Sequence, residues 1–139
     1  MKIWIDCEWN DYKGELISIA LIDERQCAFY GVLQCLNPSP WVQMNVMPHL
    51  RDQPRKSLFE LRDALRLYLV NYHTVHIIAD WPEDIKHFCD LLITGPGLRI
   101  ATPPLTMEVR RDINSDASLF PHNAIEDVLA LREMYMKTT

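Results

Sequence analysis

The 139-residue sequence is short of glycine, has no long apolar run and carries no excess of positive charge. Four glycines without a low-complexity tract argue against fibrous and disordered classes. No apolar run approaches the roughly 20 residues that a membrane-spanning helix needs. The first six residues are also unlike a signal peptide, because their short apolar run ends in an acid. We therefore expect a globular, cytoplasmic protein that has no membrane partner.

The sequence also has no Cys-x-x-Cys pair, and the spacing of its four cysteines offers no zinc ligand set. Reduced thiols, mostly buried, are expected. The net charge of −5 and the pI near 5.4 argue against a protein that holds nucleic acid by bulk electrostatics. A nuclease stays compatible with this balance if its acids gather at a metal site, because bound cations reverse the local charge.

The first half of the chain predicts three strands followed by a helix. Apolar runs separated by turn residues predict an antiparallel meander over Lys2–Asp6, Leu16–Ile22 and Cys27–Leu33. Residues 41–54 lack clean periodicity, which indicates an irregular or short-helical connection. Ser57 and Glu60 then form a capping-box pattern, so a helix is expected to run from there to about residue 71.

The second half predicts a strand, two helices and irregular segments between them. A short strand over Thr74–Ala79 precedes a helix with Pro82 in its first turn, where the missing N–H is harmless. Leu98–Ala101 is expected to be the last strand, and Pro103–Phe120 a second irregular, polar segment. Asn123 is expected to cap a C-terminal helix. The order of elements predicts one domain over residues 1–139, of α/β class, with a mixed sheet flanked by helices.

Asp6 and Glu8 lie two positions apart at the end of the first expected strand. Side chains alternate along a strand, so both carboxylates project from one face. Adjacent acids repel each other, and a cation between them removes that repulsion. Mg²⁺ and Mn²⁺ are hard ions that prefer such oxygen ligands. The alternative is a strand end that emerges into solvent, where acids are common.

Asp84 falls in the first turn of the helix that follows the strand Thr74–Ala79. Acids near a helix N-terminus interact favourably with the helix dipole, and Asp80 and Glu83 are candidates for that role. Residues just past the carboxyl end of a sheet strand often line the crevice of an α/β fold. This position favours a site role for Asp84.

His122 and Asp127 are five residues apart, which is about 140° around a helix and a poor spacing for one face. They converge only if His122 lies in the loop before the Asn123 cap while Asp127 lies one turn inside the helix. Histidine suits a general base because an unperturbed imidazole titrates near neutrality. The alternative is a surface histidine followed by an ordinary surface aspartate.

Taken in order, these motifs resemble those of the DEDD exonuclease superfamily, in the DEDDh subclass with a catalytic histidine, which includes ribonuclease T and oligoribonuclease. Asp6-Cys7-Glu8 matches the Asp-x-Glu motif, residues 79–84 match the second motif, and His122 to Asp127 match His-x₄-Asp. The family more often has Asn at Asp80 and an aromatic residue at Glu83, so the choice between Asp80 and Asp84 stays open, with Asp84 preferred. Residues 45–48 are similar to a segment of a compact bacterial and phage exoribonuclease group.

The resemblance implies a ribonuclease H-like fold and a 3′–5′ exoribonuclease that releases nucleoside 5′-monophosphates from single-stranded RNA or 3′ overhangs. It implies a two-metal site in which Asp6, Glu8, Asp84 and Asp127 hold two Mg²⁺ or Mn²⁺ ions. His122 would act as the general base. The implied partner is a single strand of RNA or an RNA 3′ end, with DNA as a second candidate. A homodimer is a further expectation, since a short chain can need a partner subunit to complete its groove.

Substrate contacts are expected from the aromatic and basic residues near these motifs. Trp9, Trp41 and Met44 are candidates to stack or wedge the last bases. Arg110 is a candidate for phosphate contact, as are other basic residues in the two irregular segments: Arg51, Arg55, Lys56 and Arg111. Simple packing of Trp9 and solvated basic loops are the alternatives. The competing functions are a non-catalytic nucleic-acid-binding protein, an endonuclease of the ribonuclease H-like group, and a structural protein whose acids only cap helices.

Overall fold

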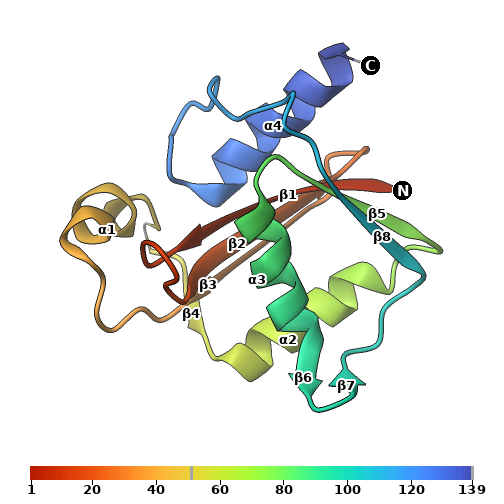
Figure 1. Ribbon diagram of the computed structural model, residues 1–139, viewed down its shortest axis with the longest axis horizontal. Helices are drawn as coiled ribbons and strands as arrows, with labels where there is room; N and C mark the ends of the chain where they lie inside the picture. Colours follow the sequence, from red (N-terminus) through yellow and green to blue (C-terminus); the bar gives the residue numbers. More distant parts are fainter. Residues whose placement is uncertain (51, 139) are drawn as a thin grey trace.

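A six-stranded mixed sheet lies at the centre of the computed structural model, which describes residues 1–50 and 52–138 (Figure 1). The strand order is β4-β3-β2-β1-β5-β8. The predicted antiparallel meander is confirmed, and β5 and β8 extend it with parallel strands. The strands are β1 (Lys2–Trp9), β2 (Leu16–Asp23), β3 (Ala28–Leu33), β4 (Arg55–Lys56), β5 (Val75–Ala79) and β8 (Leu105–Val109).

Helices cover both faces of this sheet, with α4 (Ala124–Thr138) on one face and α2 (Leu58–Leu69) and α3 (Pro82–Leu92) on the other (Figure 1). β1 is buried on both sides because its side chains alternate between the two layers. Ile3 and Ile5 pack in the core with α2 and α3, whereas Trp4 packs with α4. The predicted α/β class, a mixed sheet flanked by helices, is confirmed.

Helix boundaries follow the capping signals of the sequence. Ser57 and Glu60 form the complete capping box at the start of α2. The Asn123 side chain accepts a hydrogen bond from the Glu126 N–H at the start of α4. The segment between β3 and β4 contains the expected short helices, α1 (Pro40–Asn45) and the 3₁₀ helix η1 (Met47–Leu50). Local side-chain chemistry therefore determines where these helices begin.

Two predictions about the segment after α3 are wrong. Leu98–Ala101 is not the last strand of the sheet, because only Leu98–Arg99 is extended (β7), and it pairs with β6 (Ile93–Gly95) in a separate hairpin. The last strand is β8, which lies inside the predicted irregular segment Pro103–Phe120. β8 is an edge strand with the sequence Leu-Thr-Met-Glu-Val, whose apolar and polar residues alternate, so the sequence contained a short strand signal that the surrounding polar residues and prolines outweighed.

Some sequence expectations concern the chain as a whole. Among the described residues, no helix combines the length and apolar character needed to cross a bilayer. The four cysteines are free, with Cys7 and Cys35 buried but Cys27 exposed. Arg51, one of the candidate phosphate contacts, lies outside the described residues.

Candidate metal centre

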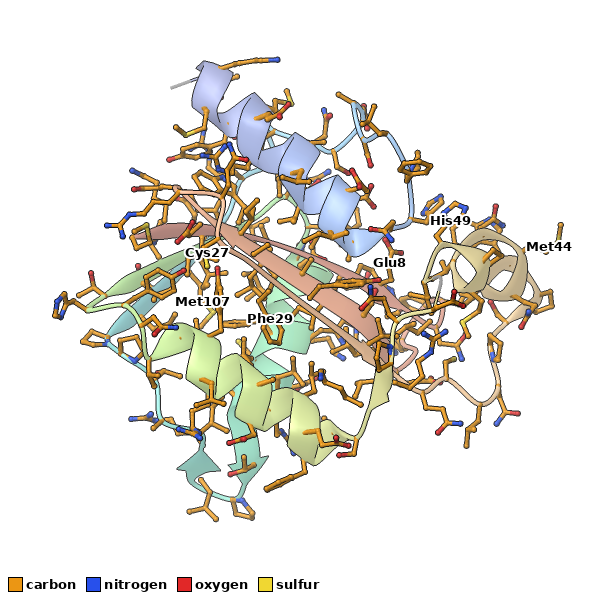
Figure 2. All side chains as sticks on the ribbon, turned by 180° about the vertical axis from the view of Figure 1, so that it is seen from behind. Glu8, Cys27, Phe29, Met44, His49 and Met107 are labelled. Carbon is orange, nitrogen blue, oxygen red and sulfur yellow. The ribbon has the colours of Figure 1, made fainter. Side chains whose placement is uncertain are left out.

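Five carboxylates converge where β1 ends, between the first turns of α3 and α4. They form two groups of three that share Asp6, one with Asp80 and Asp84 and the other with Glu8 and Asp127. Within each group, one oxygen of each residue lies within 4.8 Å of the others. Figure 2 shows Glu8 at the end of the sheet, next to the N-terminal end of α4. The structure therefore brings together Asp6, Glu8, Asp84 and Asp127, and it adds Asp80.

The fold delivers Asp6, Glu8, Asp84 and Asp127 from three separate elements, and Asp80 from the turn between β5 and α3. Asp6 and Glu8 occupy alternate positions of β1, so both side chains lie on the face covered by α4. Asp127 comes from the first turn of α4, and Asp84 from the first turn of α3 on the opposite face. Asp84 is joined to β1 because its Oδ1 accepts a hydrogen bond from the Cys7 N–H at 3.0 Å. Helix starts from both layers thus meet at one end of the sheet.

The electrostatics of this cluster oppose ionisation. Burial, followed by the charges of Asp84 and Glu8, raises the pKa of Asp6 well above its ordinary value. Burial raises the pKa of Glu8 to about 9, with the charge and hydrogen bond of Asp127 acting in the same direction. Burial and the charge of Asp80 raise the pKa of Asp84. Without a counter-charge, the site therefore favours the protonated form of these acids.

The residues present fit divalent cations. Asp6 Oδ2 is buried and has no hydrogen-bond partner in the described part of the chain. An unpaired buried carboxylate oxygen costs free energy, which a bound cation would recover. All ligand atoms in both groups are carboxylate oxygens, which suits Mg²⁺ or Mn²⁺ rather than a softer metal. Asp6 belongs to both groups, so it is placed to contact each of two neighbouring ions.

His122 lies in the loop before α4, as the sequence argument required. Its N–H donates a hydrogen bond to Asp127 Oδ2 at 3.1 Å, and its backbone has a φ of 69°, in the left-handed region. The imidazole packs edge-on against Trp41, with ring centroids 5.0 Å apart, and lies 6.5 Å from the His49 ring. His122 and Asp127 therefore converge through the backbone of His122, while the ring faces the segment of α1 and η1.

Two hydrogen bonds attach the His122 loop to η1. His49 Nδ1 lies 2.6 Å from the Pro121 carbonyl oxygen. On the other side of His122, Asn123 Nδ2 donates to the His49 carbonyl oxygen at 2.7 Å. A left-handed conformation is uncommon for a residue other than glycine and persists only where its surroundings enforce it. His49 was not among the sequence candidates, since nothing in its local pattern indicates a contact with residue 121.

Replacing Asn123 by Ala is expected to lower the free energy of unfolding by about 1–2 kcal/mol. The change removes both the cap of α4 and the bond to His49. For a chain of this size we expect a drop of about 4–8 °C in melting temperature. Thermal unfolding followed by circular dichroism measures it. Asn37→Ala is the control, because Asn37 is exposed and its side chain forms no hydrogen bond with another described residue; equal losses in both variants would contradict the assigned role.

An aromatic cleft of about 380 Å³ opens beside Glu8. Trp9, Trp41 and Trp81 line it, together with Asp11, Tyr12 and Glu83. The Trp41 and Trp81 side chains are roughly half exposed, so part of each ring is available to a flat ligand. The structure thus places the candidates Trp9 and Trp41 at the cluster. It also places Trp81 there. The sequence argument did not predict Trp81, although its position between Asp80 and Asp84 was a signal for a residue at the site.

The other two substrate candidates lie elsewhere. Met44 is 76% exposed on α1 and points away from Glu8 (Figure 2). Arg110 is paired with Asp112 and packs over the ring of Tyr135, so it is directed along α4 and away from the acids. Its neighbour Arg111 lies closer to the site, because its guanidinium stacks on Trp81 at 4.4 Å and donates to the Asp80 carbonyl oxygen. Of the two arginines, the structure favours Arg111.

Comparison with known proteins adds no family assignment. No protein-family model matches the chain, and the search of curated proteins finds no significant match.

Proposed function

We propose that this protein is a metal-dependent 3′–5′ exoribonuclease of the DEDDh type, with a ribonuclease H-like fold. The observation that carries the proposal is the two groups of three acids that share Asp6, one of whose carboxylate oxygens is buried without a partner among the described residues. Strand order supports it as well, since a three-stranded meander is extended by parallel strands on the β1 side. The four acids that the sequence motifs name are among the five that the geometry brings together.

In this proposal Asp6, Glu8, Asp84 and Asp127 hold two Mg²⁺ or Mn²⁺ ions, and Asp80 is available as a further ligand. Such ions supply an activated water and neutralise charge on the phosphate oxygens during phosphodiester hydrolysis. The chain's own contribution is to position the reacting groups. His122 accepts the proton of the attacking water, and the hydrogen bond from its N–H to Asp127 fixes its loop beside the ligands.

The aromatic cleft is the proposed site of the terminal nucleotide. Base stacking on an aromatic ring is tolerant of sequence and is worth about 1–3 kcal/mol per base. The cleft shares Glu8 with the acidic cluster, so a base stacked among its tryptophans keeps the adjacent phosphodiester near the carboxylates. Stacking on these side chains requires bases that are not already paired, so the cleft suits the end of an unpaired strand.

Incubation of the protein with 5′-labelled single-stranded RNA and Mn²⁺ tests the proposal. The native chain is expected to give a ladder that shortens from the 3′ end, with nucleoside 5′-monophosphates as products. Asp6→Ala is expected to give no ladder. A 3′-blocked RNA should survive if the enzyme needs a free end.

Other results would favour the competing functions. Cleavage of the 3′-blocked RNA into internal fragments would identify an endonuclease. Binding without cleavage, in a protein stabilised by Mn²⁺, would identify a non-catalytic binding protein. No stabilisation by Mn²⁺ and no binding would leave the acids with a structural role only.

A further inference from the structure

A second hollow lies among the β1–β2 turn, α2 and α3. It has a volume of about 380 Å³, and Lys13, Arg62, Lys86 and His87 contribute to its wall. We call it the Lys13–Lys86 cavity. Glu15 and Asp90 also line it, so positive side chains outnumber acids there. In a chain of net charge −5, this balance contrasts with the all-acid cluster nearby.

The cavity and the aromatic cleft meet at one pair of rings. Trp9 lines the cleft, and its ring lies against that of His87, with centroids 5.2 Å apart and planes 30° apart. His87 lines the cavity and follows Asp84 by about one turn of α3. The β1–β2 turn is shared in the same way, since Asp11 and Tyr12 belong to the cleft and Lys13 to the cavity. A strand leaving the cleft therefore reaches the cavity next.

His87 gives the cavity a buried polar group. It is only 4% exposed, and in the described part of the chain no protein group forms a hydrogen bond with its ring. A polar ring without a hydrogen-bond partner in the protein is satisfied by water or by a ligand. Because His87 lines the cavity, such a partner would have to approach from there. The imidazole N–H is a suitable donor to an anionic oxygen.

The charges around His87 also suit an anion. Arg62 is fixed at the end of α3 by hydrogen bonds to three carbonyl oxygens, so its charge stays in the wall. Lys86 forms an ion pair with Asp90 at 3.3 Å, but both side chains are more than half exposed, and such pairs are weak. The Lys13 ammonium lies over the Tyr12 ring at 5.4 Å and has no acid paired with it among the described residues. The Lys13 ammonium is thus available to bind phosphate, and the Lys86 ammonium can exchange its exposed pair with Asp90 for a phosphate oxygen.

We infer that the Lys13–Lys86 cavity binds a backbone phosphate of a single RNA strand, 5′ of the nucleotide held in the aromatic cleft. The inference rests on the proposed function for the position of the 3′ end. It assigns the two hollows different parts of one ligand, bases to the tryptophans and phosphate to the lysines and His87. The positive groups of the cavity would then attract the RNA one or two nucleotides from the acidic cluster, and so hold a polyanion next to that cluster.

Binding without catalysis tests this inference directly. In an Asp6→Asn/Asp127→Asn background, which removes the proposed ion ligands, fluorescence anisotropy would follow a labelled RNA of about twelve nucleotides, a length one single-strand-binding domain can cover. Lys13→Gln/Lys86→Gln is expected to weaken binding about three- to tenfold. The dependence of log K on log salt should become shallower by about 1.4, for two contacts at about 0.7 each.

The matched control is Lys2→Gln/Lys137→Gln, which removes the same charge at the far end of β1 and in the last turn of α4. It should leave the salt dependence unchanged. Equal effects of the two double variants would show that binding depends only on the net charge of the protein, and would overturn the inference. Unchanged melting temperatures of both pairs establish that folding is not the cause.

Hydrolysis separates this inference from the proposed function. With Mn²⁺ and otherwise native protein, Lys13→Gln/Lys86→Gln should lower kcat/KM on the longer RNA about three- to tenfold. It should leave a dinucleotide without a 5′-phosphate unaffected, since the only phosphate of that substrate is the one that is cut. Hydrolysis with no length-dependent effect overturns the cavity alone. Absence of hydrolysis, together with the expected change in salt dependence, overturns the enzyme and supports the cavity.

Discussion

Replacing Asp6 by Asn is expected to abolish RNA hydrolysis and to raise the melting temperature of the metal-free protein. Burial and the surrounding acids raise the pKa of Asp6, so its carboxylate is unfavourable without a cation. Asn has the same shape without the charge, and its amide can donate to a neighbouring carboxylate where Asp6 Oδ2 has no partner. Removing a shared ion ligand forfeits several kcal/mol of transition-state stabilisation, or about 10³-fold or more in rate. We expect a gain of about 4 °C in melting temperature with EDTA.

The opposite signs of these two effects make the variant diagnostic. A residue needed only for folding would lose activity and stability together, whereas a charged site is built at the expense of stability. Asp63→Asn is the matched control, because Asp63 is an exposed acid on α2 paired with Arg66 at 2.8 Å. Asp63→Asn should keep full activity. Retained hydrolysis in Asp6→Asn would show that the shared position of Asp6 has no role in the reaction.

The sequence predicted the part of the site that depends on local geometry. Alternation along a strand was enough to place Asp6 and Glu8 on one face, and β1 has that arrangement. The cap at Asn123 was enough to place His122 outside α4 and Asp127 inside it. These inferences need only the period of a strand or the start of a helix.

Local patterns of this kind could not predict contacts between distant segments. The tie between His49 and Pro121 joins residues 72 positions apart, and neither residue has a local pattern that indicates it. Arg110 and Arg111 are adjacent in sequence, but the first packs on Tyr135 and the second on Trp81. Neighbouring side chains at the end of a strand point to opposite faces. Choosing between Arg110 and Arg111 as the phosphate contact therefore required knowing that β8 exists and how it is paired.

The pairing of β8 with β5 explains both the strand that the sequence did not predict and the role of Asp80 that it left open. Among the described strands, β8 pairs only with β5, and an edge strand needs fewer apolar residues than a central one. That pairing brings Arg111 to the Asp80 carbonyl, next to the acids. Asp80 had been left open as a helix-dipole acid, and the three-dimensional arrangement shows its carboxylate within reach of Asp6. Tertiary neighbours decide the role of an acid that local sequence leaves ambiguous.

Without divalent cations, the protein is expected to lose stability as pH rises from about 5 to 9, and Mn²⁺ is expected to restore it. The folded-state pKa of Glu8, about 9, lies above its ordinary value of 4.5, so the folded protein binds more protons than the unfolded chain between these values. Stability then falls with rising pH across that window, because unfolding releases protons. Asp6, Asp84 and Asp127 shift in the same direction. We expect the melting temperature to fall on the order of 10 °C.

Mn²⁺ should reverse this trend, because it binds the ionised carboxylates and competes with protons for them. At about one hundred times its Kd, Mn²⁺ adds about 2.7 kcal/mol to the free energy of unfolding. The increase in melting temperature should therefore be larger at pH 8 than at pH 6, as measured by thermal unfolding with EDTA or Mn²⁺. Asp6→Asn/Asp127→Asn should show a flatter pH dependence and little response to Mn²⁺. Stability that rises with pH in EDTA, or an equal response to Mn²⁺ in this variant, would place the ions elsewhere and leave the five converging acids without a shared ligand.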